Sequence, residues 1–286
     1  MKWEGRRGSS NVEDDRGSGG GLGGIPLIGG GIGSVIIVLL VALLGGNPSD
    51  VLNGMTNNSS APADPAPYQE TAKEKELSQF VSVVLADTED VWSEVFKEEG
   101  MTYKNPKLVL YTGSVQSACG NASSAVGPFY CPGDQKLYID LSFYDELQQK
   151  FHAPGDFAMA YVIAHEVGHH VQYLLGTSDK VNAIRNRVSE EEFNKYSVRL
   201  ELQADYYAGV FAKRDQGRGV LEKGDIDEAL NAANAVGDDT LQKQARGYVV
   251  PESFTHGTSE QRKRWFNKGF ENGKIEGGDT FKAANL

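Results

Sequence analysis

Two histidines and a glutamate in the segment YVIAHEVGHHVQYLL, residues 161–175, have the types and spacing of a metal site. His165 and His169 are four residues apart, so on a helix both imidazoles project from one face and can bind the same ion. Glu166 lies close to that face, where its carboxylate can take a proton from a metal-activated water without being a ligand. The pattern therefore predicts hydrolysis assisted by one catalytic Zn²⁺.

Two histidines do not complete a catalytic zinc site, which needs a third protein ligand and an open position for water. After His170 the next histidine is His256, too distant for the metzincin spacing. The segment VRLELQADYYAG, residues 198–209, places Glu201 and Asp205 four apart on one helix face. Opposite the first helix, Glu201 would complete the ligand set and Asp205 would accept a hydrogen bond from a ligating histidine. Ordinary exposed acidic residues are the alternative.

The order of three segments resembles a known family. HEVGHH at 165–170, ELQAD at 201–205 and THGTSEQR at 255–262 are similar to the bacterial neutral zinc metallopeptidases, and the likeness includes the opening KWEGRR and NVEDDR and the stretch GPFYCP. The three motifs also resemble those of gluzincin proteases related to the prenyl-protein endopeptidases, although Gly257 stands where that group commonly has proline. The resemblance implies a zincin-like domain and peptidase activity.

Carried over to the matching positions, the resemblance implies roles for four residues. Glu201 would be the third zinc ligand, and Asp205 would orient a ligating histidine. His256 would lie near the metal and steady the tetrahedral transition state, with Arg262 holding its segment in place. A histidine can donate a hydrogen bond to a developing oxyanion, but a structural role for His256 is the equal alternative.

The two cysteines of the chain, Cys119 and Cys131, are separated by a Gly/Ser-rich stretch that lets them meet. We expect a disulfide in an oxidising compartment, with free buried thiols as the alternative. A cysteine metal site is disfavoured, because no second Cys pair exists and no histidine precedes His152 nearby. His152 and His170 are expected to be packing or surface residues, since His170 points about a third of a turn away from His169.

An apolar segment occupies residues 25–46, and no charged residue occurs between Arg16 and Asp50. A run of about 20 apolar residues can just cross a bilayer as a helix. Four basic residues precede the segment and the first one after it is Lys73, so the positive-inside rule places the N-terminus in the cytoplasm. We expect an uncleaved single-pass anchor in the bacterial inner membrane, with an extracytoplasmic body. A cleaved signal peptide and a buried glycine-rich segment are the alternatives.

The composition divides the chain into four parts. The stretch after the apolar segment is rich in Asn, Ser, Ala and Pro and cannot bury enough apolar surface to fold, so it is expected to be a linker. The parts are a cytoplasmic N-terminal arm (1–24), the anchor (25–46), the linker (47–71) and the zinc metallopeptidase domain (72–286).

Within the domain the pattern predicts an α+β fold that is mainly helical with a small sheet. Apolar residues from Leu77 to Phe96 recur at helical spacing. Strands are expected at 107–111 and 136–141, the second being either the edge that pairs with an extended substrate, as the gluzincin resemblance implies, or a core strand. Further helices are expected over roughly 155–175, 188–214, 225–235 and 259–271.

A net charge of −11 at pH 7 disfavours nucleic-acid binding, because an acidic surface repels phosphate backbones. The expected function is zinc-dependent hydrolysis of peptide bonds in protein or peptide substrates. One alternative is a catalytically silent zinc-binding envelope domain that acts as a protein-interaction module, and another is a structural helical domain that binds no metal.

Overall fold

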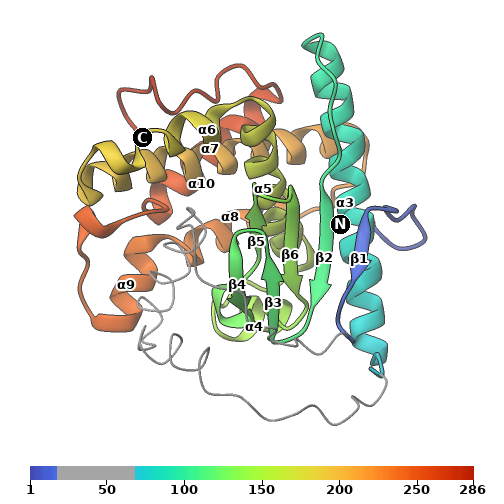
Figure 1. Ribbon diagram of the computed structural model, residues 1–286. Coiled ribbons are helices and arrows are strands. Elements are labelled where there is room, and N and C mark those ends of the chain that lie inside the picture. Colours follow the sequence, from blue (N-terminus) through green and yellow to red (C-terminus); the bar gives the residue numbers. More distant parts are fainter. Residues whose placement is uncertain (18–67) are drawn as a thin grey trace.

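The computed structural model describes residues 1–17 and 68–286 (Figure 1). The anchor expected at 25–46 and most of the linker expected at 47–71 lie outside these residues. Among the helices of the described ranges, none is both long and apolar enough to cross a membrane.

The domain contains a four-stranded sheet, in the order β1-β2-β6-β5. β1 (Val12–Asp14), β2 (Lys107–Tyr111) and β6 (Lys136–Asp140) are parallel, and β5 (Phe129–Cys131) runs antiparallel to β6. β2 pairs with β6 over residues 136–140 and β5 pairs with it over residues 136–138. Residues 136–138 therefore fit the core-strand alternative, whereas residues 139–140 have no strand partner on the β5 side within the described sheet. The edge beside β6 is formed by β5.

A hairpin of β3 (Ser114–Ser117) and β4 (Gly120–Ser123) forms a separate two-stranded sheet. The structure joins Cys119, in the turn of this hairpin, to Cys131 at the end of β5 by a disulfide. The edge strand is therefore tied covalently to the hairpin.

Helices make up most of the domain, which agrees with the mainly helical α+β fold expected from the sequence. The segment after residue 71 forms one continuous helix, and the expected helices over 155–175 and 188–214 are both present. The helices are α3 (Ala72–Glu98), α4 (Phe143–Gln149), α5 (Asp156–Leu174), α6 (Thr177–Asn182), α7 (Glu190–Gly217), α8 (Asp225–Ala235), α9 (Asp238–Arg246) and α10 (Ser259–Asn272), with short 3₁₀ turns at Ser124–Val126, Arg185–Arg187 and Pro251–Ser253.

Glycines allow the central helices to approach closely. A Cβ on Gly168 of α5 would lie 3.0 Å from the backbone oxygen of Ala204 in α7. Where α7 and α10 run side by side (Figure 1), a Cβ on Gly209 would lie 2.0 Å from the Phe266 oxygen. Because glycine has no side chain, the helix backbones can approach closely at these positions. The side chains beside each crossing therefore lie close together.

The described part of the expected N-terminal arm belongs to the domain, which corrects the boundary at residue 72. β1 pairs with β2, and Arg6 donates two hydrogen bonds of 2.6 Å to Asp87 of α3. Buried Arg16 binds Asp14 and Glu70. The segment is attached by ion pairs, by three strand residues and by a few scattered apolar contacts, such as buried Met1 and the Trp3 ring against Phe80. These apolar residues are too few and too irregularly spaced to form a hydrophobic pattern that would have indicated its position.

Candidate active site

Helices α5 and α7 bring the two histidines of the HExxH segment to the carboxylate of Glu201. His165 Nε2 lies 3.1 Å from Glu201 Oε2, and His169 Nε2 lies 3.5 Å from Glu201 Oε1. One ligand atom from each of the three residues falls within 4.8 Å of the others. Two imidazoles and one carboxylate, largely buried and converging at this spacing, fit a catalytic zinc site.

The second nitrogen of each of these imidazoles also has a partner. His165 Nδ1 donates to Asp205 at 2.9 Å, and His169 Nδ1 donates to the side-chain oxygen of Gln172 at 2.9 Å. These bonds fix both rings with Nε2 toward Glu201, which leaves Nε2 as the atom that could bind a metal. The sequence indicated Asp205 by its spacing from Glu201, but it gave no sign of Gln172.

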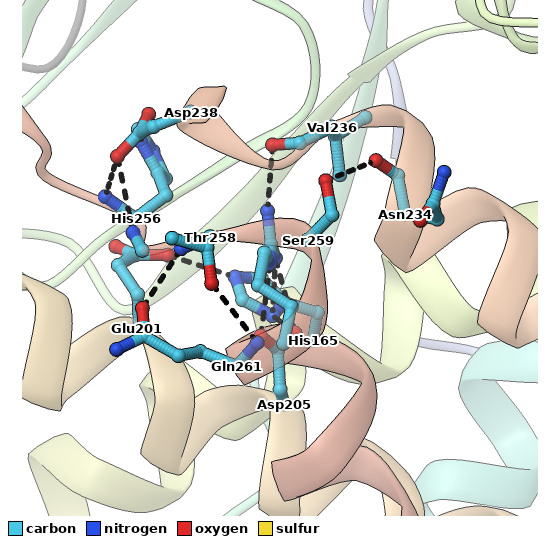
Figure 2. A network of polar contacts seen from close by, with 12 residues as sticks. His165, Glu201, Asp205, Asn234, Val236, Asp238, His256, Thr258, Ser259 and Gln261 are labelled. Carbon is cyan, nitrogen blue, oxygen red and sulfur yellow. Dashed lines mark hydrogen bonds and ion pairs between the residues drawn. The ribbon is translucent and has the colours of Figure 1, made fainter. Parts of the chain in front are cut away.

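Asp205 is fully buried and connects three helices. Its carboxylate accepts a hydrogen bond from the Tyr161 hydroxyl at 2.5 Å and from Arg262 Nε of α10 at 2.9 Å. Arg262 also donates to the Val236 carbonyl at 3.2 Å, after the end of α8. Arg262 thus anchors the start of α10 beside the histidines, and Figure 2 shows the polar network around them.

The electrostatics favour ionised carboxylates in this cluster. Burial alone would raise the pKa of Asp205, but Arg262 and His165 lower it to about 2. Burial would also raise the pKa of Glu201, but His169 and His256 hold it well below its usual range. Burial lowers the pKa of His165, yet Asp205 and Glu201 raise it to about 10. Because Arg262 balances the charge of Asp205, Glu201 is the carboxylate whose negative charge can attract a cation to the imidazoles.

Glu166 lies in the same cleft and differs from Glu201 in its protonation chemistry. Burial raises the pKa of Glu166 above its usual value, and the lowering by His169 and His165 does not cancel this effect. A carboxylate whose pKa is shifted toward neutrality is a more effective proton acceptor at physiological pH.

His256 lines this cleft together with the three residues of the cluster. Its backbone lies in a tight turn that ends at Gly257, where φ is +89°. Proline cannot adopt this angle, which gives a physical reason for glycine at the position where the gluzincin group commonly has proline. The carboxylate of Asp238 binds the turn, accepting a 2.6 Å hydrogen bond from the His256 backbone. The sequence did not indicate Asp238.

The cleft has a volume of about 200 Å³. One wall includes Phe129 and Tyr130 of the edge strand β5, so this strand borders the cleft that contains His165, His169 and Glu201. Much of the remaining lining is apolar, contributed by Val126, Pro128, Phe143, Phe151, Val162 and Val236.

The remaining two histidines lie outside the metal cluster. His170 is buried, accepts a 2.9 Å hydrogen bond from the Tyr130 hydroxyl and donates to the Lys104 carbonyl at 2.6 Å. Burial lowers the pKa of His170 to about 4, which keeps the ring neutral and suits this bridging role. His170 therefore braces β5 against α5. His152 is exposed in the loop before α5.

The chain matches the family described as "Putative neutral zinc metallopeptidase" over residues 1–281. It is 49% identical over 287 residues to "Uncharacterized protein YpfJ" of Escherichia coli (strain K12), which covers 98% of this chain and 99% of that protein. It is 39% identical over 258 residues to "Uncharacterized protein Mb2605" of Mycobacterium bovis, covering 85% of this chain and 86% of that protein. No solved structure is significantly similar to it.

Proposed function

We propose that this chain, which belongs to the neutral zinc metallopeptidase family, is a zinc-dependent peptidase that hydrolyses peptide bonds of protein substrates. The observation that carries the proposal is the largely buried cluster of His165, His169 and Glu201 with Glu166 beside it in one cleft. The cluster supplies three protein ligands and a neighbouring base, which is the arrangement that zinc-assisted hydrolysis needs.

Each residue of the site has a distinct part in the proposed reaction. When bound by His165, His169 and Glu201, Zn²⁺ supplies Lewis acidity and lowers the pKa of water toward neutrality. Glu166 accepts the proton of the attacking water and later passes it to the leaving amine. His256 donates a hydrogen bond to the carbonyl oxygen as negative charge develops on it.

The substrate is proposed to bind as an extended peptide along β5. Only one side of this strand is paired within the described sheet, and Phe129 and Tyr130 face the cleft. A peptide can add to such an edge through main-chain hydrogen bonds, while pockets beside the edge select its side chains. The apolar lining of the cleft favours apolar side chains near the cleaved bond.

We also propose that the domain works outside the cytoplasm. The Cys119–Cys131 disulfide supports this proposal, because such bonds persist in oxidising compartments. Membrane attachment through residues 25–46 stays a proposal from the sequence, but a single crossing there would separate β1 from β2, with which it pairs. Since residues 1–17 are part of the domain, this proposal now places the N-terminus on the same side as the site.

Zinc analysis of the purified full-length protein, followed by product mapping on unfolded proteins, tests the function. We expect one zinc per chain, loss of cleavage with a chelator, and recovery when zinc is restored. Stoichiometric zinc without cleavage of any unfolded protein or peptide would instead support the silent zinc-binding module. Absence of bound zinc would favour a purely structural domain.

A further inference from the structure

Asp238 is a fully buried carboxylate at the first position of α9. One of its oxygens, Oδ2, accepts hydrogen bonds from the backbone N–H groups of Thr255, His256 and Gly257, at 2.7, 2.6 and 3.0 Å. Its own backbone N–H donates to the Gly257 carbonyl at 2.9 Å. Four hydrogen bonds thus join this residue to the turn that carries His256.

The other oxygen of Asp238 faces the imidazole itself. Oδ1 lies 3.3 Å from His256 Nδ1, and Figure 2 shows His256 linked to Asp238. The Thr255 hydroxyl lies 3.0 Å from the same nitrogen. Because a carboxylate only accepts hydrogen bonds, the Asp238 contact places a proton on Nδ1. Nε2 is then the nitrogen available to the cleft, and it can donate to an oxyanion when the ring is doubly protonated.

We infer that Asp238 is a positioning residue for the hydrolytic reaction: it holds the His256 backbone and ring together so that Nε2 serves the cleft. The inference rests on the proposed function, in which His256 stabilises the oxyanion. A histidine that changes between rotamers stabilises the transition state less, because the donor must already point to where the negative charge develops. A carboxylate that binds both the turn and the ring removes that freedom.

A second carboxylate in the next position provides a matched control. Asp239 accepts hydrogen bonds from the backbone and hydroxyl of Ser259, at 2.7 and 2.9 Å. It therefore braces the same connection between α9 and α10 but makes no described contact with the His256 ring. Asp238→Asn and Asp239→Asn both remove one charge at the start of α9, and they differ in whether the ring is affected.

The test compares these two variants with wild type, in the native background and in the background of His256→Ala, using the full-length zinc-loaded protein. For Asp238→Asn we expect kcat to fall by about 10- to 100-fold with KM little changed, a loss typical of supporting groups around metal sites. Zinc content should be retained. In the His256→Ala background the same substitution should have no further effect on kcat, because the two residues act as one unit. Asp239→Asn should leave kcat within about threefold of wild type, as an uncoupled site would.

A second readout does not depend on activity. Long-range ¹H–¹⁵N spectra of the histidine rings in the wild-type protein should show His256 Nδ1 carrying a proton, and Asp238→Asn should abolish or shift that signal. A wild-type ring whose Nδ1 is unprotonated would overturn the inference. So would equal kcat losses for Asp238→Asn with and without His256. If wild type cleaves substrates and Asp238→Asn cleaves them equally well, the inference about Asp238 is wrong but the proposed function stands. An inactive wild type contradicts the proposed function.

Discussion

At the scale of single residues, the site depends on groups that hold the metal ligands as much as on the ligands. Asp205 and Gln172 each take one ring N–H, so both histidines present Nε2 to Glu201. The sequence predicted Asp205 because a helical repeat of four connects it to Glu201. Gln172 and Asp238 could not be predicted this way, since one is an ordinary polar helix residue and the other reaches His256 only through the fold.

Replacing Gln172 by methionine tests this supporting role. Methionine has a similar length but no strong hydrogen-bond acceptor for His169 Nδ1, so the ring loses its fixed orientation. We expect zinc affinity to fall by about tenfold or more, as for other supporting groups of metal sites. Competition with a chromophoric chelator measures the affinity. Unchanged affinity would show that helix α5 alone fixes His169.

Asp215, at the end of α7, should make stability depend on pH. Its side chain is fully buried, and neither oxygen has a hydrogen-bond partner in the described structure. Burial and the neighbouring Asp87 raise its pKa to about 7, and the lowering by Arg218 and Arg6 is insufficient. The folded chain therefore keeps this proton between about pH 4 and 7 while the unfolded chain has released it. Stability should fall as pH rises through this window and stay low above it.

Asp215→Asn removes this titration. The stability of the variant relative to wild type should be greater at pH 8 than at pH 4, by on the order of 2–4 kcal/mol in the free energy of unfolding. Denaturant unfolding at both pH values gives the difference, and the change with pH is informative whatever the substitution does to packing. A difference that stays constant with pH would contradict the assignment.

At the scale of elements, the helices that carry the ligands were predictable and the strands that border them were only partly so. The periodic apolar residues around HEVGHH and ELQAD indicated both helices, because long amphipathic patterns are strong signals. β1 and β5 have three residues each, too few to show alternation. The edge strand therefore had to be found in the structure, and the zincin-like assignment stays a prediction.

The close crossing of α7 and α10 should not tolerate a side chain. A Cβ at Gly209 would collide with the Phe266 backbone, so Gly209→Ala should force the helices apart and loosen the Arg262–Asp205 contact. We expect a destabilisation of about 1–3 kcal/mol, typical of overpacking. Gly217→Ala is the control on the same helix, where nothing lies within 4 Å of an added Cβ. Equal stability of the two variants would contradict the packing argument.

At the scale of the whole molecule, residues 1–17 and 68–286 form one domain. Backbone hydrogen bonds of 2.9 and 2.8 Å connect Leu108 to Asn11 and Asp15 to Leu110. Strands on opposite sides of a membrane cannot form such bonds. The sequence predicted a cytoplasmic arm from its charge and from the apolar stretch after it, and these local signals did not reveal that the arm returns to the sheet.

Labelling of single cysteines in intact cells tests this topology. Ser10→Cys and Asn186→Cys place one exposed thiol in the N-terminal segment and one in residues 68–286, and the two native cysteines are joined in a disulfide. We expect a membrane-impermeant maleimide to label both positions to the same extent in intact cells. Labelling of one in intact cells and of the other only after lysis would show that the segments lie on opposite sides of a membrane.

The central claim is that Glu166 activates water beside a zinc held by His165, His169 and Glu201. Cleavage of an unfolded protein by wild type and by Glu166→Gln, with zinc content measured in the same samples, tests it most directly. We expect about one zinc per chain in both proteins and a loss of at least about 100-fold in cleavage rate for the variant, as expected when a general base is removed. Equal cleavage by the two zinc-loaded proteins would contradict it.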